Sequence, residues 1–329
     1  MTQTTFPVTY STLDCDALKR QILPLFSTNP VIRCKFWNRG LSDVYLVETL
    51  TAHYILRISH AHWRTESEVN FELEFLSFLR RRGIPVAEPL RTRDGQLSVK
   101  IYAPEGFRYA ALFAYAPGRI PIGDLSIDQS RKLGETVAQI HQFGAEFHSS
   151  ACRQQLSLEY LLDRSLGTIE PHLRFRLGDM AYLRELIDQI KDRLSDLPKT
   201  LPYWTICWGD PHSGNVHFTA DNQLTLFDFD QCGYGWRAFE MAKFLQVSLR
   251  AGIARKVRDA FFQGYQSIQS FTPLEVSSLQ PFTQTAHIWN WCIYLESAKI
   301  HSSSRLDDQF FTTRLQQLKM LQTPEWQLF

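Results

Sequence analysis

Two short stretches of the chain combine side chains that are suited to phosphate chemistry. The first, residues 208–215, contains Asp210 and Asn215, and the second, residues 228–230, follows a run of alternating apolar residues. Phosphoryl transfer needs a carboxylate that accepts the proton of the attacking hydroxyl. It also needs oxygen ligands for Mg²⁺, which bridges the phosphates of the donor nucleotide. The Asp and Asn residues of these two stretches supply both kinds of group.

The order and spacing of these residues favour catalysis over a purely structural role. Asp210 and Asn215 are spaced as the base and the metal-binding Asn of the protein-kinase catalytic loop, and Asp228 takes the place of the metal-binding aspartate. Asp, Asn, Gly and Pro are also ordinary turn residues, and residues 228–230 alone are compatible with a surface strand. Each residue taken singly is more often structural. The three together, in this order and beside apolar strands, favour a catalytic loop.

The elements that must position these residues are predicted from periodicity and turn residues. The predicted strands span residues 31–37, 44–48, 54–58, 97–101 and 109–115, with a hairpin within residues 206–229, and the predicted helices span residues 13–26, 65–82, 128–143, 157–165 and 180–194. From residue 239 to the end the pattern is again helical. We therefore expect an α+β protein with a small β-rich N-terminal lobe, a hinge at residues 113–118 and a larger helical lobe.

Composition and charge exclude several classes of protein. Lys and Arg total 35 against 34 Asp and Glu, so the chain lacks the basic surplus of a nucleic-acid or anionic-membrane binder. The first residues are polar and acidic, unlike a secretory signal, and no apolar stretch approaches the roughly 20 residues of a membrane-spanning helix. The six cysteines form no CxxC pair, which favours reduced core thiols. We expect a soluble, cytoplasmic protein whose partners are small molecules or proteins.

The chain resembles the aminoglycoside phosphotransferase and choline kinase superfamily, near type II homoserine kinases and bacterial stress-response kinases. The resemblance covers nearly the whole chain and rests on the motif GDxHxxN, together with the metal-binding aspartate. These motif positions are Gly209, Asp210, His212, Asn215 and Asp228. The residue before the motif glycine is usually His in the family and is Trp208 here, which is expected to repack the loop without removing its chemistry.

This resemblance implies a fold, an activity and a set of ligands. It implies a two-lobed protein-kinase-like fold with a nucleotide-binding lobe at residues 1–115 and a catalytic, acceptor-binding lobe at residues 116–329. Asp210 is implied as the catalytic base, with Asn215 and Asp228 on Mg²⁺. ATP, with GTP as an alternative donor, would transfer its γ-phosphoryl group to a hydroxyl. Relatives with this site act on amino alcohols, sugars, antibiotics or protein Ser/Thr, so the acceptor stays open.

Five residues of the N-terminal lobe are implied as nucleotide contacts. Ser42 lies in the turn that covers phosphates in the family, and Arg57 stands where kinases have a phosphate-binding lysine. Glu72 is implied as the acidic partner of Arg57, although three other glutamates of the same helix compete for that role. The backbone groups of Phe113 and Ala114 are implied to hydrogen-bond adenine. The alternatives are that Arg57 is an exposed strand cation and that the hinge strand is simply core.

Further residues were assigned supporting roles. His212 is expected to stiffen the loop by an internal hydrogen bond, and Asp230 and Arg237 to support the site from behind. A helix over residues 287–296 is the candidate wall of the acceptor pocket, with Glu296 as its polar determinant.

Two other functions are compatible with parts of the sequence. A metal-dependent phosphohydrolase is suggested by Asp and His residues in the stretch 209–217, but the chain offers few histidines at usable spacing. A nucleotide-binding pseudokinase scaffold is suggested by Trp208 and Arg57. The joint presence of Asp210, Asn215 and Asp228 argues against it, because a scaffold has no physical need for all three.

Overall fold

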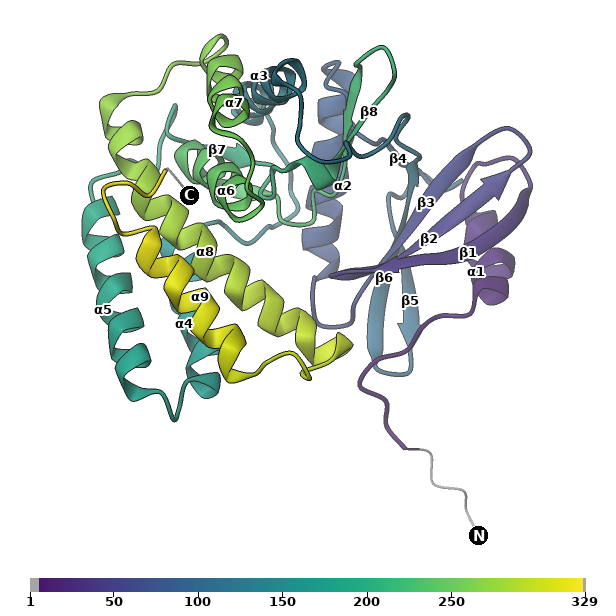
Figure 1. Cartoon of the computed structure of the whole chain (residues 1–329). Coiled ribbons are helices and arrows are strands. Elements are labelled where there is room, and N and C mark those ends of the chain that lie inside the picture. The colour runs from purple at the N-terminus through teal and green to yellow at the C-terminus, as the bar shows by residue number, and fades with distance from the viewer. Residues whose placement is uncertain (1–5, 328–329) are drawn as a thin grey trace. The chain divides into compact units, whose positions relative to one another are not determined.

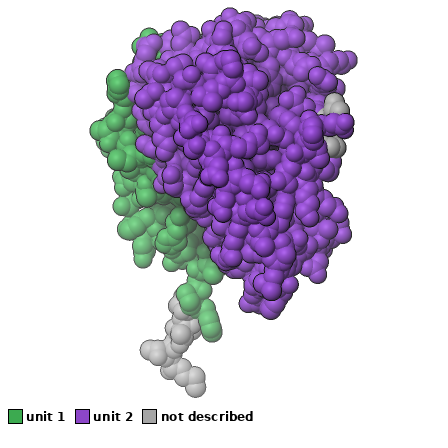
Figure 2. Space-filling view, turned by 90° about the vertical axis from the view of Figure 1, so that its left-hand side faces the viewer, with its two compact units in different colours: residues 1–117, 148–153 green, residues 118–147, 154–329 purple. Residues whose placement is uncertain are grey.

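A computed structural model describes residues 6–327 of the chain, which divide into two compact units. Unit 1 comprises Met1–Pro117 with His148–Arg153, and unit 2 comprises Gly118–Phe147 with Gln154–Phe329 (Figure 2). Each unit has its own hydrophobic core. The nucleotide-binding and acceptor-binding roles that the sequence assigns to residues 1–115 and 116–329 stay predictions.

Unit 1 is built on an antiparallel sheet with the strand order β1-β2-β3-β6-β4, and β5 pairs with β6 (Figure 1). The strands are β1 Val31–Arg39, β2 Ser42–Thr49, β3 His53–Ser59, β4 Pro89–Leu90, β5 Val99–Ala103 and β6 Gly106–Ala114. Consecutive strands β1, β2 and β3 pair with one another across short turns. The predicted meander is therefore present, and β3 is placed between β2 and β6 inside the sheet.

Two helices belong to unit 1. Helix α1 (Cys15–Gln21) is shorter than the predicted helix over residues 13–26, because a 3₁₀ turn with Pro24 in its first turn follows at Leu23–Leu25. Helix α2 (Glu66–Arg81) begins with a capping box in which Thr65 and Glu68 each accept a backbone N–H from the other. This cap fixes the start of α2, and with it the position of every side chain on the helix.

Unit 2 is mainly helical. Its helices are α3 Ile127–Gly144, α4 Arg164–Ile169, α5 Leu177–Leu194, α6 Arg237–Arg250, α7 Arg255–Gln266, α8 Pro273–His301 and α9 Asp308–Met320. A π-helical turn at Glu159–Asp163 and a 3₁₀ turn at Glu170–His172 flank α4. Helix α8 contacts α4, α5, α6 and α9 (Figure 1). Its aromatic residues Phe282, Trp289 and Trp291 lie in the core. Helix α8 is thus the central support of the unit.

Two small β-ribbons interrupt these helices and frame the loop of interest. The predicted hairpin is present as β8 (Val216–Phe218) and β9 (Leu224–Leu226), preceded by a 3₁₀ turn at Ser213–Asn215. Strand β7 (Trp204–Cys207) pairs with β10 (Gly233–Trp236), which the sequence did not predict because its two glycines are typical of a loop. Residues 208–215 therefore leave one ribbon and enter the other.

The observed architecture confirms the predicted α+β class, with an antiparallel sheet in the N-terminal part and helices in the C-terminal part. The predicted helix over residues 157–165 is replaced by the π-helical turn that runs into α4. None of the helices between residues 6 and 327 is long and apolar enough to cross a membrane.

Candidate active site

The loop that carries Asp210 is held by its backbone. Gly209 has a φ of +92°, and a Cβ atom there would lie 2.1 Å from the Gln231 carbonyl oxygen, so only glycine fits. The N–H groups of Trp208 and Gly209 donate to the two carboxylate oxygens of Glu240, over 2.8 and 2.6 Å. Glu240 is fully buried in α6. A single carboxylate thus fixes the chain immediately before Asp210.

Glu240 is itself held by a buried histidine. The Nε2 atom of His141 lies 2.8 Å from a Glu240 oxygen, and its Nδ1 atom lies 2.8 Å from the Tyr265 hydroxyl. His141, Cys207 and Glu240 place ligand-type atoms within 4.8 Å of one another. Both histidine nitrogens and both glutamate oxygens are already engaged in hydrogen bonds. The cluster therefore acts as a support for the loop, and His141 is a buried residue whose hydrogen bonds are satisfied.

Four side chains surround the carboxylate of Asp210. The Lys243 ammonium lies 3.4 Å from Oδ1. The His212 Nε2 atom lies 3.3 Å from Oδ2, the Asn215 amide nitrogen 3.4 Å and the Gln231 amide nitrogen 3.3 Å. Asp210 keeps a side-chain exposure of 19%. The carboxylate is oriented by several long contacts, yet part of it remains accessible to a ligand.

The local charges keep Asp210 ionised. Burial alone works to raise the pKa of Asp210, but the Lys243 charge and the His212 hydrogen bond outweigh it and hold that pKa well below its usual range. An ionised carboxylate is a pure hydrogen-bond acceptor, so Asp210 can receive a hydrogen bond from an acceptor hydroxyl. His212 also accepts the Gly214 N–H through Nδ1 over 2.9 Å, which is the loop-stiffening bond expected of it.

Asn215 and Asp228 offer the oxygen atoms that a magnesium ion requires. The amide nitrogen of Asn215 donates to the backbone carbonyl of Asp210 over 3.1 Å, which turns the amide nitrogen toward the loop and directs its oxygen away from it. Asp228 follows β9 and has a φ of +58°, in the left-handed region. A neutral amide oxygen and a carboxylate are hard ligands, and such ligands fit Mg²⁺. The chemistry of this donor set agrees with the predicted metal site.

Trp208 holds the strained backbone at Asp228. Its indole N–H donates to the Asp228 carbonyl over 3.0 Å, and its ring stacks on Phe229 with 5.5 Å between centroids. Both Trp208 and Phe229 are fully buried. Trp208 therefore ties the Asp210 loop to the segment with the predicted metal ligand.

Arg57 and Glu72, which the sequence paired, form an ion pair within unit 1. The two guanidinium N–H groups of Arg57, on β3, donate to the two oxygens of Glu72, on α2, over 2.7 and 2.6 Å. Glu72 is 1% exposed and Arg57 has a side-chain exposure of 13%. The alternative of an exposed strand cation is thus excluded by the geometry. The contact of Arg57 with nucleotide phosphates stays a prediction.

The other predicted nucleotide contacts are mostly buried. Ser42 is 6% exposed at the start of β2, and Phe113 is 7% exposed in β6 with the Arg57 guanidinium 5.0 Å from its ring centre. The N–H of Ala114 donates to the Glu88 carbonyl over 2.9 Å. That bond removes the Ala114 N–H from the predicted adenine contacts, so any such contact has to use its carbonyl.

The phosphate-covering turn also has a role that the sequence did not indicate. Asp43, next to Ser42, is fully buried and paired with Arg108 and Arg39, each over 2.9 Å. Burial alone would raise the pKa of Asp43, but hydrogen bonds from His60, Tyr10 and the two arginines hold it well below its usual range. The turn between β1 and β2 is therefore anchored by a buried charge cluster.

Three residues at the Asp210 site were not predicted from the sequence: Glu240, Lys243 and Gln231. Glu240 and Lys243 lie in a helix that mixes apolar and polar residues, where a charged residue is usually taken for part of a solvated face. Their only signal is that they lie three residues apart on α6 and so share one helix face. No sequence pattern predicts a role for Gln231, because its position beside Asp210 depends on the turn after Asp228.

Arg237 and Glu296 form contacts outside the surroundings of Asp210, and their predicted roles stay predictions. Arg237 does not reach the Asp210 carboxylate; it binds Glu275 through two bonds of 2.5 and 2.9 Å at the start of α6. On α8, Glu296 contacts Lys299 over 2.8 Å and Thr168 over 3.3 Å. It is Trp289 that connects to the site: its indole N–H donates to Gln231 over 3.1 Å, and Gln231 in turn contacts Asp210.

Comparison with known proteins agrees with this geometry. A model of the phosphotransferase enzyme family matches residues 33–277. A protein of Synechocystis sp. that has no assigned function is 56% identical over 324 residues, which cover 98% of this chain and 90% of that protein. Amicoumacin kinase of Bacillus subtilis is 23% identical over 71% of each chain.

Solved structures share the fold. An amicoumacin kinase in complex with AMP-PNP and Ca²⁺ has a TM-score of 0.76, with 18% identity over 94% of both chains. A microcompartment-associated aminopropanol kinase also has a TM-score of 0.76, with 18% identity over 93% of this chain and 95% of that one. The predicted resemblance and the protein-kinase-like fold are thereby confirmed. The chain belongs to the phosphotransferase enzyme family and is a kinase.

Proposed function

We propose that this kinase transfers the γ-phosphoryl group of ATP to a hydroxyl group of a small molecule, with Asp210 as the base. The observation that carries the proposal is the environment of Asp210: an ionised, partly exposed carboxylate oriented by Lys243, His212, Asn215 and Gln231. The names of the relatives support a small-molecule acceptor, because they include an amicoumacin kinase, a hydroxylysine kinase and homoserine kinases.

Asp210 binds the acceptor hydroxyl and receives its proton. The hydroxyl oxygen forms a bond to the γ-phosphorus, the bond from that phosphorus to the β–γ bridging oxygen breaks, and the bridging oxygen leaves with ADP. Because Lys243 and His212 lower the pKa of Asp210, the carboxylate is a weak base. It therefore takes the proton late, once the hydroxyl oxygen has lost electron density to phosphorus, and acts mainly by orientation.

The remaining assignments concern the donor nucleotide. Asn215 and Asp228 would hold Mg²⁺, which when bound neutralises the charge on the nucleotide phosphates. Arg57, oriented by Glu72, would contact the phosphates, and Ser42 would meet them from the turn before β2. Adenine would lie against the Phe113–Ala114 segment. The AMP-PNP and Ca²⁺ in the amicoumacin kinase complex support a nucleotide and a divalent cation as ligands.

The acceptor is expected to lie against the side of Asp210 that Gln231 and Trp289 define. The indole of Trp289 packs at 4.7 Å from the ring of Tyr160, whose buried hydroxyl has no hydrogen-bond partner among the described residues. An unpaired buried hydroxyl next to an aromatic wall suits an acceptor with both an apolar body and a polar group.

Incubation of the full chain with Mg²⁺, ATP and pools of amino alcohols, sugars and aminoglycosides, with ADP formation as the readout, tests the proposed function. We expect ADP to form only when a suitable acceptor is present. Phosphate release from phosphate esters without an acceptor would instead identify a phosphohydrolase. Nucleotide binding with no turnover on any pool, including protein Ser/Thr substrates, would identify a scaffold.

The metal assignment has a separate test by thermal shift. We expect Mg²⁺ to increase the stabilisation by ATP in the parent chain and to lose that effect in Asp228→Ala. Asp188→Ala, which removes an exposed carboxylate from α5, is the matched control and should keep the effect. Equal Mg²⁺-dependent stabilisation in Asp228→Ala and Asp188→Ala would show that Asp228 is no metal ligand.

A further inference from the structure

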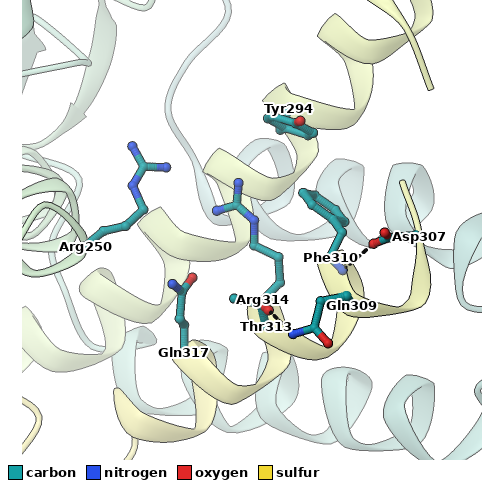
Figure 3. Close-up of a pocket in the computed structure, with 8 residues that line it drawn as sticks. All are labelled: Arg250, Tyr294, Asp307, Gln309, Phe310, Thr313, Arg314 and Gln317. Atoms are coloured by element: carbon teal, nitrogen blue, oxygen red, sulfur yellow. Dashed lines mark hydrogen bonds between the residues drawn. The ribbon is translucent and has the colours of Figure 1, made fainter. Parts of the chain in front are cut away.

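A cavity of unit 2 lies at the C-terminal end of α6, away from Asp210. It has a volume of about 390 Å³ and is lined by side chains from the end of α6, from α8 and from α9 (Figure 3). Arg250 enters it from the last residue of α6, and Arg314 from α9. Lys243, which contacts Asp210, is seven residues before Arg250 on the same helix, or about 10 Å along its axis. The cavity is therefore separate from the transfer site.

The two guanidinium groups in this cavity converge on one neutral acceptor. The Asn290 side-chain oxygen accepts from Arg250 over 2.8 Å and from Arg314 over 3.3 Å. Arg314 is only 9% exposed. Neither arginine forms an ion pair with a carboxylate in the described part of the chain. Two like charges, one of them nearly buried, thus share a single amide oxygen.

Two other buried arginines of this protein, Arg237 and Arg108, are neutralised by carboxylates. Arg237 is 3% exposed and binds both oxygens of Glu275, while Arg108 is fully buried and binds Asp43. Burying a cation without a counter-charge is unfavourable, because the protein interior replaces little of its hydration. The two arginines of the cavity lack the carboxylate partner that Arg237 and Arg108 have.

The charged groups around the cavity do not supply the missing anion. Asp307 lies on the lining, but its carboxylate caps α9 by accepting the Phe310 N–H over 2.8 Å. His287, behind the cavity, contacts the Arg314 carbonyl over 3.0 Å, and its burial lowers its pKa to about 3, so that it is neutral. Burial and the charge of Arg250 lower the pKa of Arg314 to about 10, which still leaves it protonated at neutral pH.

The aromatic wall orients the buried guanidinium. The rings of Tyr294 and Phe310 stack with centroids 4.9 Å apart, and the Arg314 guanidinium lies 5.5 and 5.2 Å from their centres. Figure 3 shows both rings on one side of Arg314, with Arg250 on the other side. Stacking holds a guanidinium plane in place and leaves its N–H edge for hydrogen bonds. The edge is thereby prepared for a planar or tetrahedral oxyanion.

We propose that this cavity binds an oxyanion, the phosphate or carboxylate group of a small molecule, between the guanidinium groups of Arg250 and Arg314. The site goes beyond the proposed kinase activity and does not depend on it. The anion neutralises the shared positive charge, and the rings of Tyr294 and Phe310 contact the remainder of the molecule.

Thermal unfolding of the full chain with added sodium phosphate, compared with sodium chloride at equal ionic strength, tests the proposal. A parallel titration with sodium succinate distinguishes a phosphate from a carboxylate. We expect at least one of the two anions at about 20 mM to raise Tm by about 2 to 4 °C, because a ligand that binds only the folded state stabilises it. If neither anion raises Tm above the chloride value, the proposal is overturned.

Variants decide where the anion binds. Arg250 is exposed, so Arg250→Gln should fold, keep or raise its Tm in chloride because a like charge is removed, and lose most of the anion-dependent shift. Arg255→Gln, which removes an exposed arginine paired with Asp259, is the matched control and should keep the shift. An anion-dependent shift of equal size in Arg250→Gln and Arg255→Gln would place the anion elsewhere, including at the nucleotide site, and overturn the proposal.

Discussion

The two units of this kinase each contain a buried ion pair, and the two pairs are built differently. In unit 1, Arg57 and Glu72 form a closed pair, with two parallel bonds of 2.7 and 2.6 Å that use both carboxylate oxygens. In unit 2, Lys243 and Asp210 form an open pair, with a single contact of 3.4 Å between the ammonium and one carboxylate oxygen. Glu72 is 1% exposed, whereas the Asp210 side chain is 19% exposed.

The difference indicates what each carboxylate is for. A bidentate guanidinium uses both oxygens of its carboxylate partner and fixes the orientation of both side chains. Glu72 therefore orients Arg57 and has little hydrogen-bonding capacity left for a ligand. An ammonium is a point charge, so Lys243 lowers the pKa of Asp210 while contacting only one of its two oxygens. The closed pair is suited to positioning, and the open pair is suited to a group that has to bind a substrate hydroxyl.

The largest expected effect follows from replacing the carboxylate of the open pair. Asp210→Asn should lower the rate of phosphoryl transfer by about 10²- to 10⁴-fold, because the amide cannot accept the proton of the hydroxyl. ATP affinity should be nearly unchanged. Steady-state kinetics with the true acceptor, together with nucleotide titration, measure both quantities. A variant that retains most of the parent's turnover would remove Asp210 from the mechanism.

Breaking the closed pair should mainly affect stability and nucleotide binding. Arg57→Met leaves Glu72 buried without its cation and should lower the free energy of unfolding by about 3 kcal/mol, near the lower end of the range for broken buried pairs. Arg57→Lys keeps the positive charge but loses the bidentate geometry of the guanidinium group. Its stability and ATP affinity should lie between those of Arg57→Met and the parent. Urea denaturation and ATP titration of the three proteins are the measurements. Equal values in all three would contradict the role of Arg57.

Removing the Lys243 ammonium, the cation of the open pair, should lower the transfer rate and change the pH dependence of kcat. Lys243→Met should slow transfer by about 10- to 100-fold, the value of one hydrogen bond to a charged group. In the parent, the lowered pKa of Asp210 keeps the carboxylate ionised, and its contribution to stability is lost only as pH falls from about 4 toward that lowered pKa. Without Lys243, the opposing effect of burial should move the acid limb of the kcat profile to higher pH.

The pH at which kcat falls on the acid side of its profile separates an effect of the Lys243 charge from an effect of its packing. Lys243→Arg keeps the positive charge and should keep the position of the limb, even if the larger side chain lowers the rate. An acid limb at the same pH in the parent, Lys243→Met and Lys243→Arg would show that Lys243 does not control the protonation of Asp210.

The smallest expected effect concerns the link between the Asp210 loop and Asp228, the proposed metal ligand. Trp208→Phe should keep the stack on Phe229 and lose the hydrogen bond to the Asp228 carbonyl, a change worth about 1 kcal/mol. The Mg²⁺ concentration for half-maximal activity should rise about fivefold, with acceptor KM unchanged. An unchanged Mg²⁺ requirement would show that the bond does not position Asp228.

Much of the fold and of the candidate site follows from local patterns in the sequence. The period-two runs predicted the meander, and the motif around Asp210 predicted a polar loop followed by a hairpin, which is present as β8 and β9. The pairing of Arg57 with Glu72, which the resemblance implied while three other glutamates competed, is also present. It depends on the register of one strand and the capped start of one helix. Strand β10 did not follow, because its glycines look like a loop and only pairing with β7 makes it a strand.

Local periodicity and turn chemistry act over a few residues, and these determine the elements and the types of residue on each loop. Tertiary packing determined which distant side chains complete the site. Glu240 and Lys243 reach the Asp210 loop because α6 packs beneath it, and Trp289 reaches it from α8 through Gln231. Such contacts depend on how helices pack against one another, which no spacing along the chain encodes. The same packing brings together Arg250 of α6 and Arg314 of α9, which are 64 positions apart in the sequence.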